Sequence, residues 1–252
     1  MLSLGLLRSY TTWENITAAV KNPRATFQTL KAVSFDISRV CSLLSTNQGE
    51  FNHYIEEVRS NQDFISHISR KLKDFESRLK QEGLDTGIMG SPLAGVLYAI
   101  IRSLSPEVVL ETGVASGVSS AYILLALEEN RKGKLFSIDL PSQRWPLPEG
   151  EQPGWLIPKE LKHRWTLRLG RSSDVLPGIL EQLKSVDIFL HDSERSYENM
   201  KWEYQVVWPY VKYGGLLLSH DIDANEAFPE FCKETKAPKF IYSGRFGGIV
   251  KK

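Results

Sequence analysis

Acidic side chains follow apolar runs at several points of the sequence. Glu111 precedes a Gly-x-x-x-Gly turn, Asp139 ends the run Phe-Ser-Ile-Asp, and Asp192 and Asp221 each follow a histidine. The carboxyl ends of strands in an open α/β sheet are where such proteins bind their ligands. We therefore expect these carboxylates to line a ligand-binding crevice.

The first of these segments reads Val-Val-Leu-Glu-Thr-Gly-Val-Ala-Ser-Gly-Val-Ser-Ser over residues 108–120. Glycine lets the backbone approach a ligand closely, and the start of the following helix adds free N–H groups and a positive dipole end. A generic nucleotide site would place phosphate there. Glu111 would repel phosphate but suits the ammonium group of an amino-acid ligand.

Asp139 is expected at the tip of the second strand, where a carboxylate can bind the two ribose hydroxyls of an adenosine-containing cofactor. NAD and S-adenosylmethionine would both use such a residue, so it indicates adenosine and not the reaction. The alternative interpretation is a cap of the local turn.

Asp192 and Asp221 are expected at neighbouring strand ends that face the same crevice, with Glu194 close by. Carboxylate oxygens in such a place suit Mg²⁺ or another hard cation. The same two residues could instead cap loops, or pair with Arg195 and Arg245.

Strands and helices alternate in the second part of the chain. We expect strands at 107–112, 134–139, 165–169, 186–191 and 216–220, helices at 119–130, 173–184, 197–211 and 224–233, and a closing hairpin of 239–243 with 248–251. Near-continuous apolar strands separated by helices indicate a mostly parallel sheet covered on both faces. The predicted fold class is α/β, a Rossmann-like doubly wound sheet with a C-terminal antiparallel hairpin.

Residues 1–90 contain no convincing strand and are expected to form an N-terminal helical extension to a domain at 91–252. An apolar stripe at spacings of three and four within 47–83 predicts one or two helices that end near Gly83. These helices would pack on the catalytic domain or on a second subunit, as in a homodimer, or form a lid over the substrate pocket. The long connection 141–164 is either a rigid surface excursion or a wall of that pocket.

The composition is that of an ordinary soluble protein. The net charge of +1, from 31 basic and 30 acidic residues, gives no reason to expect a nucleic-acid partner. Cys41 and Cys232 have neither metal-ligand spacing nor the density of a disulfide framework. With no apolar run long enough for a membrane span and no signal-peptide pattern, a cytoplasmic location is expected.

The ordered set of motifs resembles the small-molecule O-methyltransferases of the class I S-adenosylmethionine-dependent superfamily. The likeness is to the branch with macrocin-type sugar methyltransferases and cephalosporin hydroxylase-like proteins. Glu-Thr-Gly-Val-Ala-Ser-Gly-Val-Ser-Ser resembles their first motif and Ser-Ile-Asp-Leu-Pro their second. His-Asp-Ser-Glu-Arg-Ser-Tyr-Glu resembles the Asp-Gly-Asp-His-Ser-Tyr-Glu segment after their fourth strand. The likeness covers residues 91–252.

The resemblance implies a role for each motif. The cofactor residues would be Glu111, Thr112, Gly113, Ser116, Gly117 and Ser119 around the amino-acid end, Asp139 on the ribose, Ser172 with Gly170 and Arg171 near the adenine, and Asp192. Asp192 and Asp221 match the metal-binding positions of metal-dependent relatives. Two departures stand out: Ile222 where a third ligand is common, and Arg195 where a histidine or lysine base is common.

The predicted reaction is methyl transfer from S-adenosylmethionine to a hydroxyl of a small-molecule acceptor. The expected catalytic residues are Asp192, His220 and Arg195, with His191 or Glu194 as other candidate bases and Mg²⁺ as a candidate cofactor. Arginine stays protonated, so Arg195 would orient an anionic substrate and not take a proton. The alternatives are a non-catalytic cofactor-binding module and an NAD-dependent oxidoreductase, although the chain lacks Gly-x-Gly-x-x-Gly.

Overall fold

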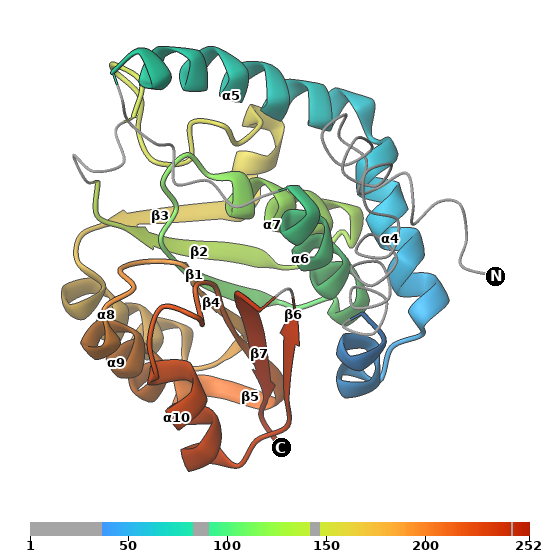
Figure 1. Cartoon of the computed structure of the whole chain (residues 1–252), viewed down its shortest axis with the longest axis vertical. Coiled ribbons are helices and arrows are strands. Elements are labelled where there is room, and N and C mark those ends of the chain that lie inside the picture. The colour runs from blue at the N-terminus through green and yellow to red at the C-terminus, as the bar shows by residue number, and fades with distance from the viewer. Residues whose placement is uncertain (1–36, 83–90, 142–146, 243) are drawn as a thin grey trace, which may run out of the picture.

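The computed structural model describes residues 37–82, 91–141, 147–242 and 244–252. These residues contain a seven-stranded sheet with the strand order β3-β2-β1-β4-β5-β7-β6 (Figure 1). The strands are β1 (Val108–Thr112), β2 (Lys134–Asp139), β3 (Trp165–Leu169), β4 (Val186–His191), β5 (Val211–Ser219), β6 (Lys239–Tyr242) and β7 (Phe246–Val250).

The first five strands are parallel, and β7 runs antiparallel to both β5 and β6. The chain order reverses between β1 and β4, where Thr112 lies opposite His191. Such a reversal opens a crevice at the carboxyl ends of the two strands. The predicted Rossmann-like fold with its C-terminal antiparallel hairpin is confirmed.

Helices cover both faces of the sheet (Figure 1). They include α4 (Gln48–Ser60), α5 (Gln62–Glu82), α6 (Ser91–Leu104), α7 (Val118–Glu129), α8 (Ser172–Leu183), α9 (Tyr197–Val207) and α10 (Ala227–Thr235), with 3₁₀ turns η1 (Lys159–Arg164) and η2 (Trp208–Tyr210). One apolar cluster joins the sheet to α4–α7 and another joins it to α8–α10. Strands buried on both faces need the continuous apolar runs that the sequence shows.

Some element boundaries differ from expectation. The predicted helix 197–211 stops at Val207, and the next residues, which include Pro209, form the 3₁₀ turn η2. Strand β5 starts at Val211 and not at Leu216, and it continues through two glycines that the sequence suggests as a break. Those glycines are paired with the C-terminus, because Gly214 N donates to the Lys251 carbonyl (2.7 Å) and Lys251 N donates to the Gly215 carbonyl (3.0 Å).

Two further boundaries are displaced by a few residues. Helix α10 begins at Ala227 and not at residue 224. The Asn225 side chain accepts the N–H of Ala227, the first residue of the helix (2.8 Å). Strand β7 begins at Phe246, inside the predicted turn, because Phe246 pairs with Tyr242.

The described N-terminal helices share a core with the rest of the molecule. Asn47 caps α4 through hydrogen bonds from the N–H groups of Gly49 (2.8 Å) and Glu50 (3.1 Å). Buried apolar residues of α4 and α5 belong to the same cluster as α6 and α7; they are Phe51, Ile55, Val58, Phe64, Ile68 and Phe75. The predicted end at Gly83 and the side chain of Leu79 lie outside the described residues. The domain division at 90/91 and a homodimer stay predictions.

Among the residues that the structure describes, no helix is both long and apolar enough to cross a membrane.

Candidate cofactor and acceptor site

The loop between β1 and α7 requires glycine at two positions. Gly113 has φ +88°, and a Cβ there would lie 2.1 Å from the carbonyl oxygen of Asp192. Gly117 has φ +90°, and a Cβ there would lie 2.6 Å from the Cα of Gly154. Any larger residue would therefore push the loop away from the tip of β4 or from the segment that covers it.

Glu111 lies in the interior of the protein and not at the mouth of the crevice, where the sequence places it. Its side chain is fully buried. The carboxylate accepts hydrogen bonds from the hydroxyls of Ser119 (2.6 Å), Ser120 (2.6 Å) and Ser137 (2.9 Å). Burial raises the pKa of Glu111 to about 7, against the opposing effect of these donors. The expected place at the mouth of the crevice is not observed, because the hydroxyls of three serines hold the carboxylate inside.

The hydroxyls of the loop also point inward. Ser119 donates to Glu111, and Thr112 Oγ1 donates to Oε2 of the buried Glu203 (2.5 Å). Ser116 is buried, and its carbonyl accepts the Leu156 N–H (3.0 Å). Since the hydroxyls of Thr112 and Ser119 are engaged internally, these two residues would offer a ligand mainly their backbone.

Asp139 lies at the end of β2, beside this loop. Its Oδ2 accepts the N–H groups of Val114 (2.6 Å) and Ala115 (2.9 Å). Burial raises the pKa of Asp139, although the two backbone donors oppose the shift. Asp139 thus caps the loop, which was the alternative interpretation. Its Oδ1 has no hydrogen-bond partner among the described residues, so a ribose contact remains compatible with this geometry.

The predicted adenine segment adjoins Asp139. Gly170 N donates to the Asp139 carbonyl (2.9 Å), which places the start of α8 at the same end of the sheet. Ser172 Oγ donates to Oδ1 of Asn199 (3.3 Å), and Arg171 is exposed. The structure therefore brings residues 170–172 to the tip of β2.

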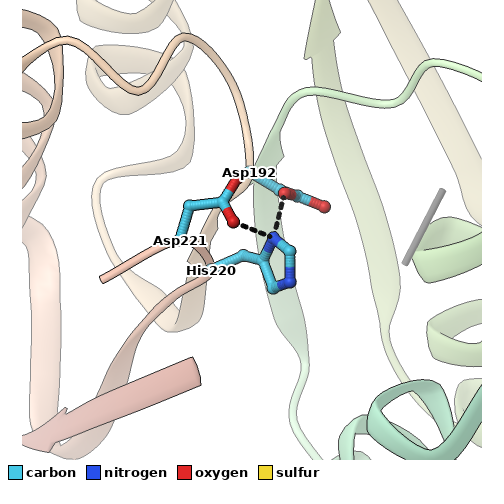
Figure 2. A group of neighbouring side chains, drawn as sticks. All are labelled: Asp192, His220 and Asp221. Carbon is cyan, nitrogen blue, oxygen red and sulfur yellow. Dashed lines mark ion pairs between the residues drawn. The ribbon is translucent and has the colours of Figure 1, made fainter. Parts of the chain in front are cut away.

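A second group of polar side chains gathers at the tips of β4 and β5. Figure 2 shows Asp192, His220 and Asp221 converging, with the second ring nitrogen of His220 directed away from both carboxylates. His220 Nδ1 lies 3.1 Å from Asp192 Oδ1 and 3.5 Å from Asp221 Oδ1. The carbonyl of Asp192 touches Gly113, so this group borders the glycine loop.

The charges of this group are strongly coupled. Burial alone would lower the pKa of His220, but hydrogen bonds to Asp192 and Asp221 outweigh it and raise the pKa to about 10. The His220 hydrogen bond lowers the pKa of Asp221 to about 2, with help from the charges of Arg245 and Arg195. His220 is therefore a cation at neutral pH in this arrangement.

Two arginines complete the group. Arg195 Nη1 lies 3.3 Å from Asp221 Oδ2, and Arg245 Nη2 contacts Asp221 Oδ1. Arg245 Nε also lies 3.5 Å from Asp223 Oδ1. Three carboxylates thus face two guanidinium groups and one imidazolium, which leaves the group close to neutral.

Asp192, His220 and Asp221 are also spaced as metal ligands. Their donor atoms all lie within 4.8 Å of one another. Ligands in adjacent positions on a cation with bonds of about 2.1 Å are separated by roughly 3.0–3.4 Å, close to the His220 distances above. An ion would have to displace the His220 proton and compete with both arginines for Asp221.

The third member of the group, His220, was expected as a catalytic residue and not as a metal ligand. Ile222, at the position where relatives often place a ligand, is buried in the apolar cluster under α10. His220 takes the third place instead. Asp221 has φ +52°, and this left-handed residue lets two consecutive side chains, His220 and Asp221, both reach Asp192.

The other candidate bases lie elsewhere. His191 is buried, and its Nδ1 lies 2.7 Å from Glu203 Oε2. Glu194 is exposed, and its backbone carbonyl accepts a hydrogen bond from Asn199 Nδ2 (2.9 Å). Of the three candidates, His220 alone is in contact with Asp192 and Asp221.

Glu203 was not predicted. This buried residue of α9 also accepts hydrogen bonds from Thr112 (2.5 Å), Ser193 (2.8 Å) and Asn199 (3.2 Å). Burial would raise the pKa of Glu203, but the charge and hydrogen bond of His191 outweigh it and lower the pKa. The sequence holds a signal, since Glu203 falls on the helix face of Met200, Tyr204 and Val207, which is otherwise apolar.

Comparisons with known proteins agree on one fold. A family model described as a methyltransferase domain matches residues 110–222. No curated protein sequence matches significantly.

Three solved structures illustrate the likeness. An O-methyltransferase from Bacillus cereus in complex with SAH (S-adenosylhomocysteine) has a TM-score of 0.55 at 12% identity, over 80% of this chain and 100% of that one. The Podospora anserina methyltransferase PaMTH1, bound to SAH, has a TM-score of 0.55 at 10% identity, over 75% and 87%. The O-methyltransferase TomG from Streptomyces achromogenes, in complex with SAM and involved in tomaymycin synthesis, has a TM-score of 0.53 at 14% identity, over 69% and 86%. At these identities the likeness shows the fold.

Proposed function

We propose that this chain, whose residues 110–222 match a family model described as a methyltransferase domain, transfers a methyl group from S-adenosylmethionine to a hydroxyl of a small molecule. One observation carries the proposal. The Asp192–His220–Asp221 group directly borders the glycine loop at the point where the strand order reverses.

The glycine loop and the tip of β2 fit the cofactor. The backbone loop at 113–118, whose glycines let it pack directly against Asp192 and Gly154, suits the amino-acid end of S-adenosylmethionine. Asp139 suits the ribose through Oδ1, and residues 170–172 suit the adenine. When bound, S-adenosylmethionine supplies an electrophilic methyl group on its sulfonium.

The Asp192–His220–Asp221 group is assigned to the acceptor. The two carboxylates hold His220 by Nδ1, which leaves Nε2 as the ring atom that takes the proton of the acceptor hydroxyl. Because the pKa of His220 is raised to about 10, its basic form is a small fraction at neutral pH, and the rate is expected to rise with pH. Arg195 holds Asp221 and attracts an anionic group of the acceptor.

Mg²⁺ on Asp192 and Asp221 stays part of the proposal as a second means of lowering the hydroxyl pKa. It is supported by the ligand spacing and opposed by the guanidinium groups on Asp221. The homodimer, the cytoplasmic location and the lack of a nucleic-acid partner stay predictions.

The test is transfer of labelled methyl from S-adenosylmethionine to a panel of phenols, catechols, sugars and hydroxy acids, with Mg²⁺ or with EDTA. We expect at least one acceptor to be methylated. His220→Gln should lower kcat about a hundredfold, the usual size of a general-base effect, with the Kd for SAH within twofold of wild type. The matched control, His163→Gln, changes a histidine that is 57% exposed.

Folded protein that binds SAH but methylates no acceptor would favour a non-catalytic binding module. An unchanged kcat in His220→Gln would remove His220 from the mechanism. Activity abolished by EDTA and restored by Mg²⁺ would show that a bound metal ion is needed to lower the pKa of the acceptor hydroxyl.

A further inference from the structure

The segment 154–157 lies directly on the glycine loop. Gly154 N donates to the Ala115 carbonyl (2.9 Å), and Leu156 N donates to the Ser116 carbonyl (3.0 Å). Gly154 is confined on two sides, because a Cβ there would lie 2.3 Å from the ring of Trp165, and its Cα already faces Gly117. The segment therefore holds two carbonyls of the loop assigned to the cofactor.

Helix α5 holds the other side of the same segment. His67 Nε2 lies 3.1 Å from the Leu156 carbonyl, and Lys71 Nζ donates to the Trp155 carbonyl (2.9 Å). The Lys71 ammonium also lies 5.7 Å from the centre of the Trp155 ring, and Phe75 meets that ring edge-on at 5.2 Å. One helix face, at spacings of four residues, thus contacts two consecutive residues of the segment.

The Trp155 side chain contributes no hydrogen bond to this attachment. Its ring is buried, yet within the described ranges of the chain its Nε1 has no hydrogen-bond partner. Buried polar groups are normally paired. The polar anchors of the segment on this side are therefore its two carbonyls, and both depend on side chains of α5.

We infer that His67 and Lys71 are positioning residues that hold segment 154–157, and through it the glycine loop, in the arrangement that binds the cofactor. The inference rests on the proposed function. It gives α5 a task other than that of a lid or a dimer contact. The chain of contacts runs from α5 to the carbonyls of Trp155 and Leu156, and from the N–H groups of Gly154 and Leu156 to Ala115 and Ser116.

The first measurement is hydrogen exchange of the full chain without ligand, followed in peptides that cover 113–119 and 153–158. His67→Leu combined with Lys71→Met removes both donors and keeps apolar bulk. We expect exchange in both peptides to be at least about fivefold faster, the loss of two hydrogen bonds worth a factor of this order or more. Calorimetry should show the Kd for SAH weakened about fivefold or more, since less of the protein then holds the binding arrangement.

Two controls separate positioning from general stability. His67→Gln with Lys71→Arg keeps a donor at each site and should restore both readouts to within about twofold. His53→Leu with Lys134→Met makes the same chemical changes at exposed positions of α4 and β2 and should leave both unchanged. The unfolding temperature of every variant is also measured. A loss of SAH affinity that only reflects a less stable fold would then be recognised by a lower unfolding temperature.

The outcomes are distinct. If wild type binds SAH and the double variant binds it equally well, the inference is overturned. Restoration by the conservative pair, with weaker binding in the disruptive pair, supports it. If wild type binds no SAH, the proposed function fails, and the exchange data alone decide whether α5 holds the loop: unchanged exchange at 113–119 overturns that as well.

Discussion

The carboxylates of the two halves of the crevice are held in opposite ways. At the tips of β1 and β2, Glu111 and Asp139 accept hydrogen bonds from neutral donors, hydroxyls and backbone N–H groups, and both are buried. At the tips of β4 and β5, Asp192 and Asp221 share the imidazolium of His220, Asp221 also contacts two guanidinium groups, and both carboxylates remain partly exposed.

This difference assigns different tasks to the two halves. Neutral donors that surround a buried carboxylate fix the shape of the glycine loop and cannot easily exchange for a ligand. Cations at a partly exposed carboxylate can be displaced by a substrate or an ion. We therefore expect changes in the first half to act mainly on stability and loop shape, and changes in the second half on chemistry.

The largest expected effect on stability is that of the Glu111 carboxyl. Its pKa is about 7 in the fold and 4.5 as the reference value, so the unfolded chain releases its proton first. Stability should then fall as the pH rises from about 4.5 to about 7 and stay level above, at a cost of about 3 kcal/mol. Glu111→Gln stays neutral and should be more stable than wild type at pH 8, with little difference near pH 5, in urea unfolding.

The control for this change is Glu181→Gln on the exposed side of α8. A difference between wild type and Glu111→Gln that does not vary with pH would show that Glu111 is not held as a raised-pKa carboxyl, and the contrast between the halves would weaken.

The opposite pH dependence is expected at Asp221. Its pKa is about 2 in the fold against 3.8 as the reference value, so it stabilises the fold above about pH 4, and this contribution is lost as the pH falls towards 2. Asp221→Asn should cost about 2 kcal/mol at pH 6, and the deficit should shrink below pH 4. Asparagine tolerates the left-handed backbone at this position, so the substitution tests charge and not strain.

Urea unfolding at pH 6 and pH 3 measures this effect, with the exposed Asp223→Asn for comparison. Equal stability of Asp221→Asn and wild type at pH 6 would mean that the arginines and His220 contribute nothing to holding Asp221.

The smallest expected effect concerns metal ions. One imidazole and two carboxylates suit Mn²⁺ better than Mg²⁺, which prefers oxygen ligands and retains its water. Calorimetry should give tighter binding of Mn²⁺ than of Mg²⁺. Arg195→Gln, which frees one oxygen of Asp221, should tighten Mn²⁺ binding by about threefold, a modest value for a half-exposed ion pair. Weaker Mn²⁺ binding in this variant would show that Arg195 does not compete with the ion.

The sequence predicts strands well where the apolar run is continuous, and the bounds of β2, β3 and β4 agree with those expected. The start of β5 is mispredicted because its pairing partner is distant in sequence. The strand continues through Gly214 and Gly215, since the backbone of Lys251 forms hydrogen bonds with both.

The positions of the site residues are likewise predictable from local sequence but not from contacts that are distant in sequence. A strand end can be located from sequence, but the depth of Glu111 depends on three hydroxyls that meet only in the fold. The convergence of His220 with Asp221 depends on one left-handed residue, which no periodicity reveals.

The most direct test of S-adenosylmethionine as the cofactor is calorimetric titration of the purified chain with SAH and, separately, with NAD⁺. We predict micromolar binding of SAH, no binding of NAD⁺, and weaker SAH binding in Asp139→Ala. Folded protein that binds NAD⁺ or neither ligand would contradict the account.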